Sequence, residues 1–285
     1  MQGSFFSAKM SAMDENRRGY ALKAPGHGPF PRVDDHLVEP EVTRDQIIGG
    51  HRVVKLPADP PRADQWGRLN FVLLPHVVPG YTAASDLLTR FDEESDFASD
   101  TCIYKDGVDP ATGTRYLEEI AFEVVSEQNE GWVTEKAWRM HRRGVRRIFS
   151  IWVETQQVCE WSPESESWFP LEPETRIADP CLVTPLPVAA LFDERKADYA
   201  VIDALVAKDS PAIRDWDAAA EARAKARGEI KGTAESILII LEARDISVDE
   251  AQRQEILSCQ DLNRVNQWLD RAVVASSADE VTSEP

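Results

Sequence analysis

Cysteine and histidine are scarce in this sequence, which has 4 cysteines and 5 histidines among 285 residues. The cysteines stand far apart without any CxxC pair, at Cys102, Cys159, Cys181 and Cys259. The histidines are equally scattered. A zinc site needs clustered thiolates and imidazoles, and a disulfide scaffold needs a dense cysteine pattern. We therefore expect neither, and the sparse thiols are typical of a reducing compartment.

Long apolar runs are lacking as well. Residues 1–20 contain no apolar stretch of the roughly 7–15 residues that a signal peptide needs. The apolar run at 237–241 is far shorter than the roughly 20 residues of a membrane span. We therefore expect a cytoplasmic protein with no membrane partner.

Basic residues are outnumbered, with 32 lysines and arginines against 50 acidic residues and a net charge of −18. This balance argues against coating a polyanion through overall charge, but it allows a local basic site. In residues 134–147 the only acidic residue is Glu135, and the basic ones are Lys136, Arg139, Arg142, Arg143, Arg146 and Arg147. We interpret Arg139, Arg142, Arg143 and Arg146 as a face that docks DNA weakly and in a salt-sensitive way. The alternative is a solvated helix face paired to acidic neighbours.

The chain divides into three segments by composition. Residues 1–40 form an extended lead-in, because Gly and Pro interrupt 24–31. Residues 41–187 form the main domain. Residues 188–285 are Ala-rich and predict a helical appendage with a short polar tail, whose apolar helix faces are compatible with a homodimer. The expected helices lie at 221–232, 235–246 and 262–273, with a capping box at Ser247 and Glu250.

The main domain has an α/β pattern that predicts a mixed sheet flanked by helices. A hairpin at 46–56 turns at Gly49-Gly50, and helices are expected at about 63–73, stopped by Pro75, and at 133–144, capped by Gly144. Strands are expected at 81–91, 101–104, 116–126, 147–153, 158–161 and 168–171. The strand at 116–126 is apolar on both faces, which is typical of the middle of a covered sheet.

Two carboxylates occupy positions in or beside apolar strands, where burying a negative charge is unfavourable. Glu123 interrupts the doubly apolar strand, and an unpaired buried carboxylate costs several kcal/mol. Asp100 directly precedes the apolar 101–104 strand, and neighbouring strands could bring both to one ion. Two carboxylates with water and phosphate oxygens suit Mg²⁺ or Mn²⁺. Lys136, on the following helix, could extend its ammonium to the same site. The structural alternatives are a turn role for Asp100 and an arginine partner for Glu123.

The segments EIAFEVVSEQ, VTEKAWRM and RRGVRRIFSIWV resemble the Uma-two family of proteins assigned as restriction endonucleases, in the PD-(D/E)XK nuclease superfamily. The resemblance covers roughly residues 40–175 and includes the QIIGGHRVV hairpin. It implies a restriction-endonuclease-like fold in which Asp100 and Glu123 bind the metal. The usual lysine position two residues after the glutamate holds Val125, whereas Lys136 matches the family's lysine on the next helix. The family's Pro-Asp pair is replaced by Ser99-Asp100 in this sequence. Three further positions differ from the residues that are frequent in the family: Gln46 replaces Glu, Arg62 replaces His and Met140 replaces Tyr.

Three hypotheses for function follow. The leading one is a Mg²⁺-dependent endonuclease that hydrolyses DNA phosphodiester bonds, with Asp100, Glu123 and Lys136 as catalytic residues. The second is a catalytically weak or inactive nuclease-fold module that acts in protein interaction or oligomerisation. The third is a small-molecule phosphoesterase that uses the same metal pair.

Overall fold

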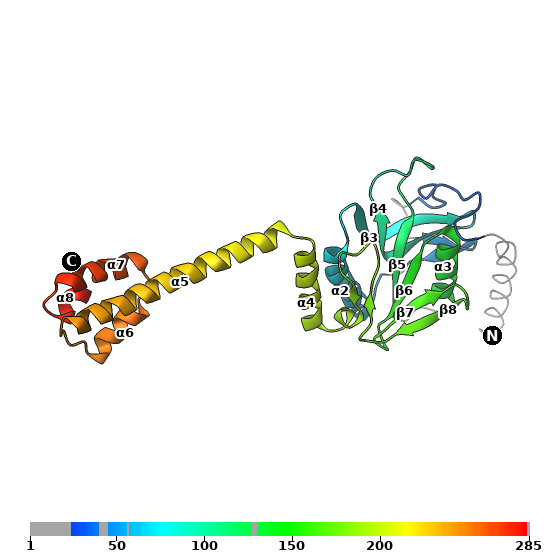
Figure 1. Ribbon diagram of the computed structural model, residues 1–285. Coiled ribbons are helices and arrows are strands. Elements are labelled where there is room, and N and C mark those ends of the chain that lie inside the picture. The colour runs from blue at the N-terminus through cyan, green and yellow to red at the C-terminus, as the bar shows by residue number, and fades with distance from the viewer. Residues whose placement is uncertain (1–23, 40–44, 56, 127–129, 284–285) are drawn as a thin grey trace. The chain divides into compact units, whose positions relative to one another are not determined.

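The computed structural model describes residues 24–39, 45–55, 57–126 and 130–283, and an eight-stranded sheet runs through its first part (Figure 1). The strands are β1 (Asp45–Ile48), β2 (His51–Val54), β3 (Tyr81–Asp92), β4 (Ser95–Lys105), β5 (Glu118–Val125), β6 (Arg147–Trp152), β7 (Gln157–Ser162) and β8 (Ser167–Leu171). Their order is β2-β1-β4-β5-β6-β7-β8, with β3 paired to β4. Only β5 and β6 pair in parallel among these strands, so the sheet is mixed, as predicted, and most of its pairs are antiparallel.

Strand β5 lies between β4 and β6 and is buried along nearly its whole length, which confirms the prediction of a covered central strand. Ile120, Phe122 and Val124 belong to one hydrophobic cluster, whereas Ala121 belongs to another. This alternation follows from the period of two in a strand. Glu123 therefore lies on the Ala121 side of the sheet.

Strand β4 is much longer than the predicted 101–104. It begins at Ser95 and forms a long hairpin with β3, so Asp100 lies inside the strand rather than before it. The additional residues are largely polar yet buried, including Ser95, Asp96 and Ser99. Hydrophobic periodicity cannot find such a strand, because its buried residues include polar side chains such as Ser95 and Asp96, which accept hydrogen bonds from Gly49 N and Leu37 N.

Helices cover both faces of this sheet. Helix α2 (Pro60–His76) contributes to the cluster with Phe122, and α3 (Glu130–Arg143) contributes to the cluster with Ala121. Figure 1 shows the two helices on opposite sides of the sheet. Helix α2 starts earlier than predicted because Asp59 caps it by accepting a hydrogen bond from Arg62 N. The prediction that Pro75 stops it is wrong, since Pro75 lies within its last turn.

Gly144 ends α3, as predicted. It has φ 121°, and the amides of Gly144 and Val145 both donate to Met140 O. The hairpin turn at Gly49-Gly50 is also confirmed, with φ values of 58° and 76°. The described part of the lead-in, 24–39, lies against the sheet domain, since Val33 O accepts a hydrogen bond from Arg90 N.

The chain separates into two units between Lys208 and Asp209. The first unit ends with β9 (Arg176–Ile177), β10 (Leu186–Pro187), the 3₁₀ helix η1 (Val188–Leu191) and α4 (Glu194–Ala207). Helix α4 packs on α2 through the small residues Ala197 and Ala200. The predicted boundary at 187/188 therefore lies before η1 and α4, which belong to the sheet domain.

The second unit is helical, as predicted, and has a core of its own. It consists of α5 (Pro211–Ala243), α6 (Glu250–Ser258), α7 (Leu262–Val274) and α8 (Ala278–Thr282). One continuous helix, α5, covers the predicted helix 221–232 and the predicted helix 235–246 as far as Ala243, so Gly232 does not end a helix. The capping box consists of Asp249 and Gln252, not Ser247 and Glu250. No helix in the described ranges has the length and apolar character that crossing a membrane would require.

Candidate active site

Asp100 and Glu123 lie on adjacent antiparallel strands. Thr101 pairs with Phe122 and Cys102 with Ala121, so one further step of the same register places Asp100 opposite Glu123. Directly opposed residues project to the same face of a sheet. Both carboxylates are buried, with 2% and 1% of the residue exposed. The structure thus brings the two predicted acids together.

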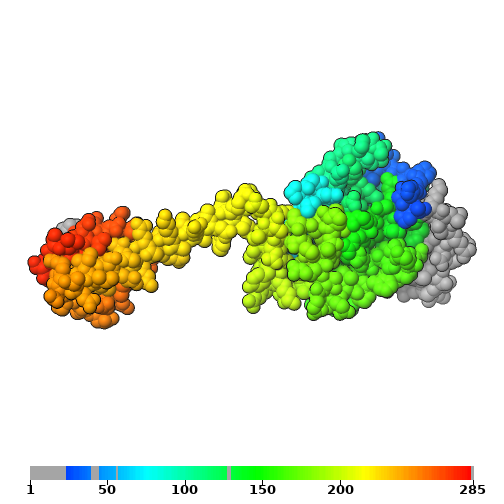
Figure 2. Space-filling view, in the orientation of Figure 1, coloured from blue at the N-terminus to red at the C-terminus, as the bar shows by residue number. Residues whose placement is uncertain are grey.

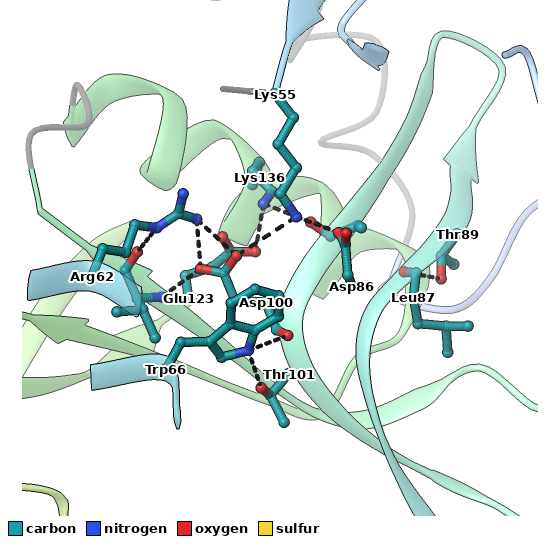
Figure 3. A network of polar contacts seen from close by, with 12 residues as sticks. Lys55, Arg62, Trp66, Asp86, Leu87, Thr89, Asp100, Thr101, Glu123 and Lys136 are labelled. Carbon is teal, nitrogen blue, oxygen red and sulfur yellow. Dashed lines mark hydrogen bonds and ion pairs between the residues drawn. The ribbon is translucent and has the colours of Figure 1, made fainter. Parts of the chain in front are cut away.

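The Asp100 carboxylate is held by two neighbours. Arg62 Nη2 donates to Oδ1 at 2.8 Å and to Oδ2 at 2.9 Å, and Val124 N donates to Oδ2 at 2.8 Å (Figure 3). Val124 N thereby bonds a side chain at the point where the β4–β5 pairing ends. Arg62 Nε also donates to Val124 O, so the same guanidinium links the carboxylate to the end of β5. These contacts fix the orientation of the carboxylate.

Lys136 lies beside Glu123, as its predicted role requires. The Lys136 Nζ atom is 2.6 Å from Glu123 Oε1 and donates a hydrogen bond to Ala98 O at 2.8 Å. The contact with Glu123 is an ion pair outside hydrogen-bond geometry, and buried Oε1 accepts no hydrogen bond from the described residues. Figure 3 shows the ammonium pointing between the two strands from α3. Asp100, Glu123 and Lys136 therefore form one cluster.

Glu123 is a poor site for a negative charge. Burial raises its pKa to about 6; Lys136 opposes this shift, and the charge of Asp100 adds to it. Lys55 also lowers the pKa of Glu123. Two buried carboxylates side by side resist joint ionisation unless cationic charge compensates them.

Three residues of this cluster were not predicted as site residues. Lys55 Nζ lies 3.8 Å from Asp100 Oδ1 and contacts Asp86 closely. Trp66 Nε1 donates to Asp100 O at 2.9 Å, and the Lys55 ammonium lies 5.8 Å from the centre of its ring. The third residue is Arg62, which was noted only as a departure from the family pattern. The Asp59 cap places Arg62 in the first turn of α2, a signal that Asp-Pro-Pro could have given. No sequence signal marks Lys55, which follows the hairpin.

The predicted basic face of α3 is not formed by Arg139, Arg142 and Arg143. These residues are buried, with 2%, 8% and 9% exposed. Arg139 bonds Asp92 and Glu135, and Arg143 donates to Pro31 O and stacks on Phe30. A guanidinium inside the fold cannot dock a phosphate backbone, which corrects the prediction for these three positions.

Arg146 is the one predicted DNA-contacting residue that is partly exposed, with 42% of its side chain accessible. It pairs with Asp179 at 2.7 Å and with Glu119 at 3.1 Å. These contacts match the alternative of a surface cation paired to acidic neighbours. Arg146 lies just after α3, where its amide donates to Glu119 O.

Asp100 and Glu123 could provide a metal ion with at most two carboxylate groups as protein ligands. Across the described ranges, no group of three or more His, Cys, Asp and Glu side chains is arranged to hold a metal ion. Any cation at Asp100 and Glu123 would therefore complete its coordination with water or substrate oxygens, as Mg²⁺ commonly does.

Comparison with family models and with curated proteins finds no match. Among solved structures, the chain is similar to one from Anabaena variabilis ATCC 29413 that is described as "a putative nuclease belonging to DUF820". The two are 16% identical, with 52% of this chain and 89% of that chain covered and a TM-score of 0.44. This distant similarity assigns no residue of the site.

Proposed function

We propose that this protein is a metal-dependent endonuclease with a PD-(D/E)XK-type, restriction-endonuclease-like domain that hydrolyses DNA. The observation that carries the proposal is the meeting of Asp100, Glu123 and Lys136 between β4, β5 and α3. Their element order, with acids on antiparallel strands and the lysine on the following helix, agrees with the Uma-two resemblance.

The residues fit Mg²⁺ or Mn²⁺ in charge and donor type. Asp100 and Glu123 would hold the ion, because hard cations prefer carboxylate oxygens. Burial, together with the nearby charge of Asp100, raises the pKa of Glu123 even though Lys136 opposes the shift, so a further cation beside this carboxylate would be favourable. A bound divalent cation would polarise the scissile phosphodiester and lower the pKa of a coordinated water.

The remaining residues position these groups. Arg62, Val124 N and Trp66 hold Asp100 and its backbone in place. Ala98 O holds the Lys136 ammonium beside Glu123, where it would stabilise negative charge that develops on a phosphate. Lys55 adds a second ammonium at the more exposed side, with 20% of its side chain accessible. Binding of DNA would be weak and salt-sensitive in a chain of net charge −18.

One observation favours a second function. Arg62 already contacts both oxygens of Asp100, and a cation must compete with that guanidinium for one of them. A nuclease fold in which this arginine permanently replaces the metal would be a catalytically inactive module for protein interaction. The two functions differ in a measurable way, since only the first predicts cation-dependent cleavage.

The test is nicking of supercoiled plasmid by the full chain with Mg²⁺ or Mn²⁺. We expect Asp100→Asn and Glu123→Gln each to lower the rate at least about 100-fold, because either change removes a carboxylate from the ion. Glu154→Gln is the matched control, because Glu154 is an exposed carboxylate in the turn after β6. Unchanged nicking in both site variants, at unchanged thermal stability, would refute the assignment. Absence of cation-dependent nicking in the parent protein would favour the inactive module.

A second readout identifies the substrate class. A small chromogenic phosphodiester should be hydrolysed far more slowly than plasmid DNA, because it lacks the flanking phosphates that a nuclease binds. Comparable rates on both substrates would instead indicate a small-molecule phosphoesterase.

A further inference from the structure

The N-terminal half of helix α5 contributes no residue to the hydrophobic core that the described residues of its own unit form. The 33-residue helix buries Ala234, Ile237 and Leu241 in the core of the second unit, all in its C-terminal half. Between Pro211 and Glu229 every described residue is exposed or only half-buried, and Trp216 is 64% exposed. Figure 2 shows this yellow segment as a bare helix on the visible side.

The stripe of side chains that the C-terminal half of α5 buries continues along the same face of the exposed N-terminal half. At about 100° per residue, a series of positions separated by steps of three or four residues can fall on one narrow face. In α5 this face comprises Ala212, Trp216, Ala219, Arg223, Ala226, Ile230, Ala234, Ile237 and Leu241. Helix α7 packs against α5 and, with α6 and α8, contributes to the core around its C-terminal part. The stripe thus continues from the buried C-terminal part of α5 into a segment that the described residues of the second unit do not bury.

Between Ala212 and Ile230 the residue spacing of the stripe is the same in both chain directions. Two copies of the stripe can therefore face each other with the helices antiparallel. In an antiparallel pair centred near Glu221, Trp216 lies level with Ala226 of the other helix, and Ala219 lies level with Arg223. Trp216 of each chain then faces Ala226 of the other chain, so a large side chain lies opposite a small one at both ends of the pair. The alanines permit close approach of the two backbones, and the Arg223 stem can cover apolar surface while its guanidinium reaches outward.

The charges of the segment have opposite signs at its two ends. Residues 211–221 carry three acidic side chains and one basic one: Asp215, Asp217 and Glu221 against Arg214. Residues 222–231 carry four basic side chains and one acidic one: Arg223, Lys225, Arg227 and Lys231 against Glu229. A parallel pair would set like charges beside each other, whereas an antiparallel pair sets each acidic half beside a basic half.

We propose that residues 211–230 of α5 bind the same segment of a second copy of this chain as an antiparallel helix pair. The contact is isologous, so a two-fold axis passes near Glu221 and one surface serves both copies. The interface is small and rich in alanine, so the dimer is weak and depends on salt. This association is independent of the chemistry at Asp100 and Glu123.

Sedimentation equilibrium of the full chain over a concentration series, up to about 100 µM, at low and high salt, tests the pairing. We expect a concentration-dependent dimer that salt weakens. Reversing the acidic half (D215K/D217K/E221K) or the basic half (R223E/K225E/R227E) should each weaken association at least about tenfold. An equimolar mixture of the two variants should restore the dimer, because one then carries two basic halves and the other two acidic halves. The control E242K/D270K reverses exposed charges outside the segment and should leave association unchanged.

Helix orientation is tested separately by cross-linking in a Cys259→Ser background, with a short bismaleimide. Ala222→Cys lies near the proposed two-fold axis and should cross-link to its own copy, whereas Ala212→Cys lies near an end and should not. Efficient cross-linking at both positions would mean parallel helices and overturn the proposal. A parent chain that stays monomeric at every concentration would overturn it as well, as would half-reversed variants that associate like the parent while keeping their helical circular dichroism.

Discussion

Helix α3 carries two buried basic side chains, Lys136 and Arg139, and each of them contacts a different cluster of acidic residues. Arg139 lies between Asp92 and Glu135, at 2.6 and 2.8 Å, and is only 2% exposed. Burial lowers the pKa of Arg139, but the two carboxylates outweigh this effect and raise it. Lys136 meets Glu123, whose pKa is raised and whose Oε1 lacks a hydrogen bond.

The difference teaches which of the two clusters is structural. Around Arg139 the charged groups stabilise one another, so the cluster holds β3 and α3 together without need of a ligand. Around Lys136 two adjacent strand carboxylates compete for cationic charge from Lys136, Arg62 and Lys55. Perturbed carboxylates of this kind concentrate at functional sites. The predictions below separate the two clusters by their effects on stability and on cation binding.

The largest expected effect comes from removing each cation. Arg139→Met leaves the buried carboxylates of Asp92 and Glu135 without this cation and should lower the free energy of unfolding by about 3–5 kcal/mol. Lys136→Met should cost less, about 1–3 kcal/mol, because Glu123 can take up a proton. Urea unfolding of both variants at pH 7 measures the difference. Equal losses would contradict the distinction between a structural and a functional cluster.

Gly49 allows the Arg139 cluster to be disturbed without changing any charge. A Cβ at Gly49 would lie 2.5 Å from Arg139 Nη2, so Gly49→Ala should cost about 2–3 kcal/mol from displacement and backbone strain together. Gly50 is the matched control, because it also has a positive φ but no atom within 4 Å of the added Cβ. Gly50→Ala should cost only about 1 kcal/mol of backbone strain. Neither variant should alter cation affinity, and a loss of affinity in Gly49→Ala would show that the clusters are coupled.

Glu123 predicts a specific pH dependence of stability in the metal-free protein. Burial raises its pKa in the folded state to about 6, above the ordinary value of 4.5, so the folded protein binds more protons between these values. Stability from this group is therefore present below about pH 4.5 and lost as the pH rises through 6. Relative to Glu123→Gln, the parent should lose about 1–2 kcal/mol over this window, measured by urea unfolding at each pH. A parallel pH profile in the two proteins would contradict the raised pKa.

The smallest expected effect concerns Arg62. Arg62→Met removes the guanidinium that contacts both oxygens of Asp100 and should tighten Mn²⁺ binding severalfold, as measured by calorimetry. Arg68→Met serves as the control, because Arg68 lies on the same helix without a role in the cluster. Weaker Mn²⁺ binding in Arg62→Met would mean that the arginine supports the site by orienting Asp100 rather than by competing with the cation.

The sequence predicts the central strand and its acid well, because apolar alternation on both faces makes Glu123 conspicuous. It predicts Lys136 from helical periodicity together with the family resemblance. It fails for residues 95–99, where buried polar side chains give no hydrophobic signal. It also fails for Arg139, Arg142 and Arg143, since the composition of one helix does not reveal that Asp92 or Pro31 O, far away in the chain, lies in bonding distance. Lys55 lies at the site only through tertiary packing.

The central claim is that Asp100 and Glu123 jointly hold one divalent cation. Mn²⁺ titration of the full chain, followed by electron paramagnetic resonance of the free ion, tests it without depending on catalysis. We expect one bound Mn²⁺ per chain in the parent and in Glu154→Gln, and loss of that ion in both Asp100→Asn and Glu123→Gln. Undiminished Mn²⁺ binding in either site variant, with the fold intact by circular dichroism, would contradict it.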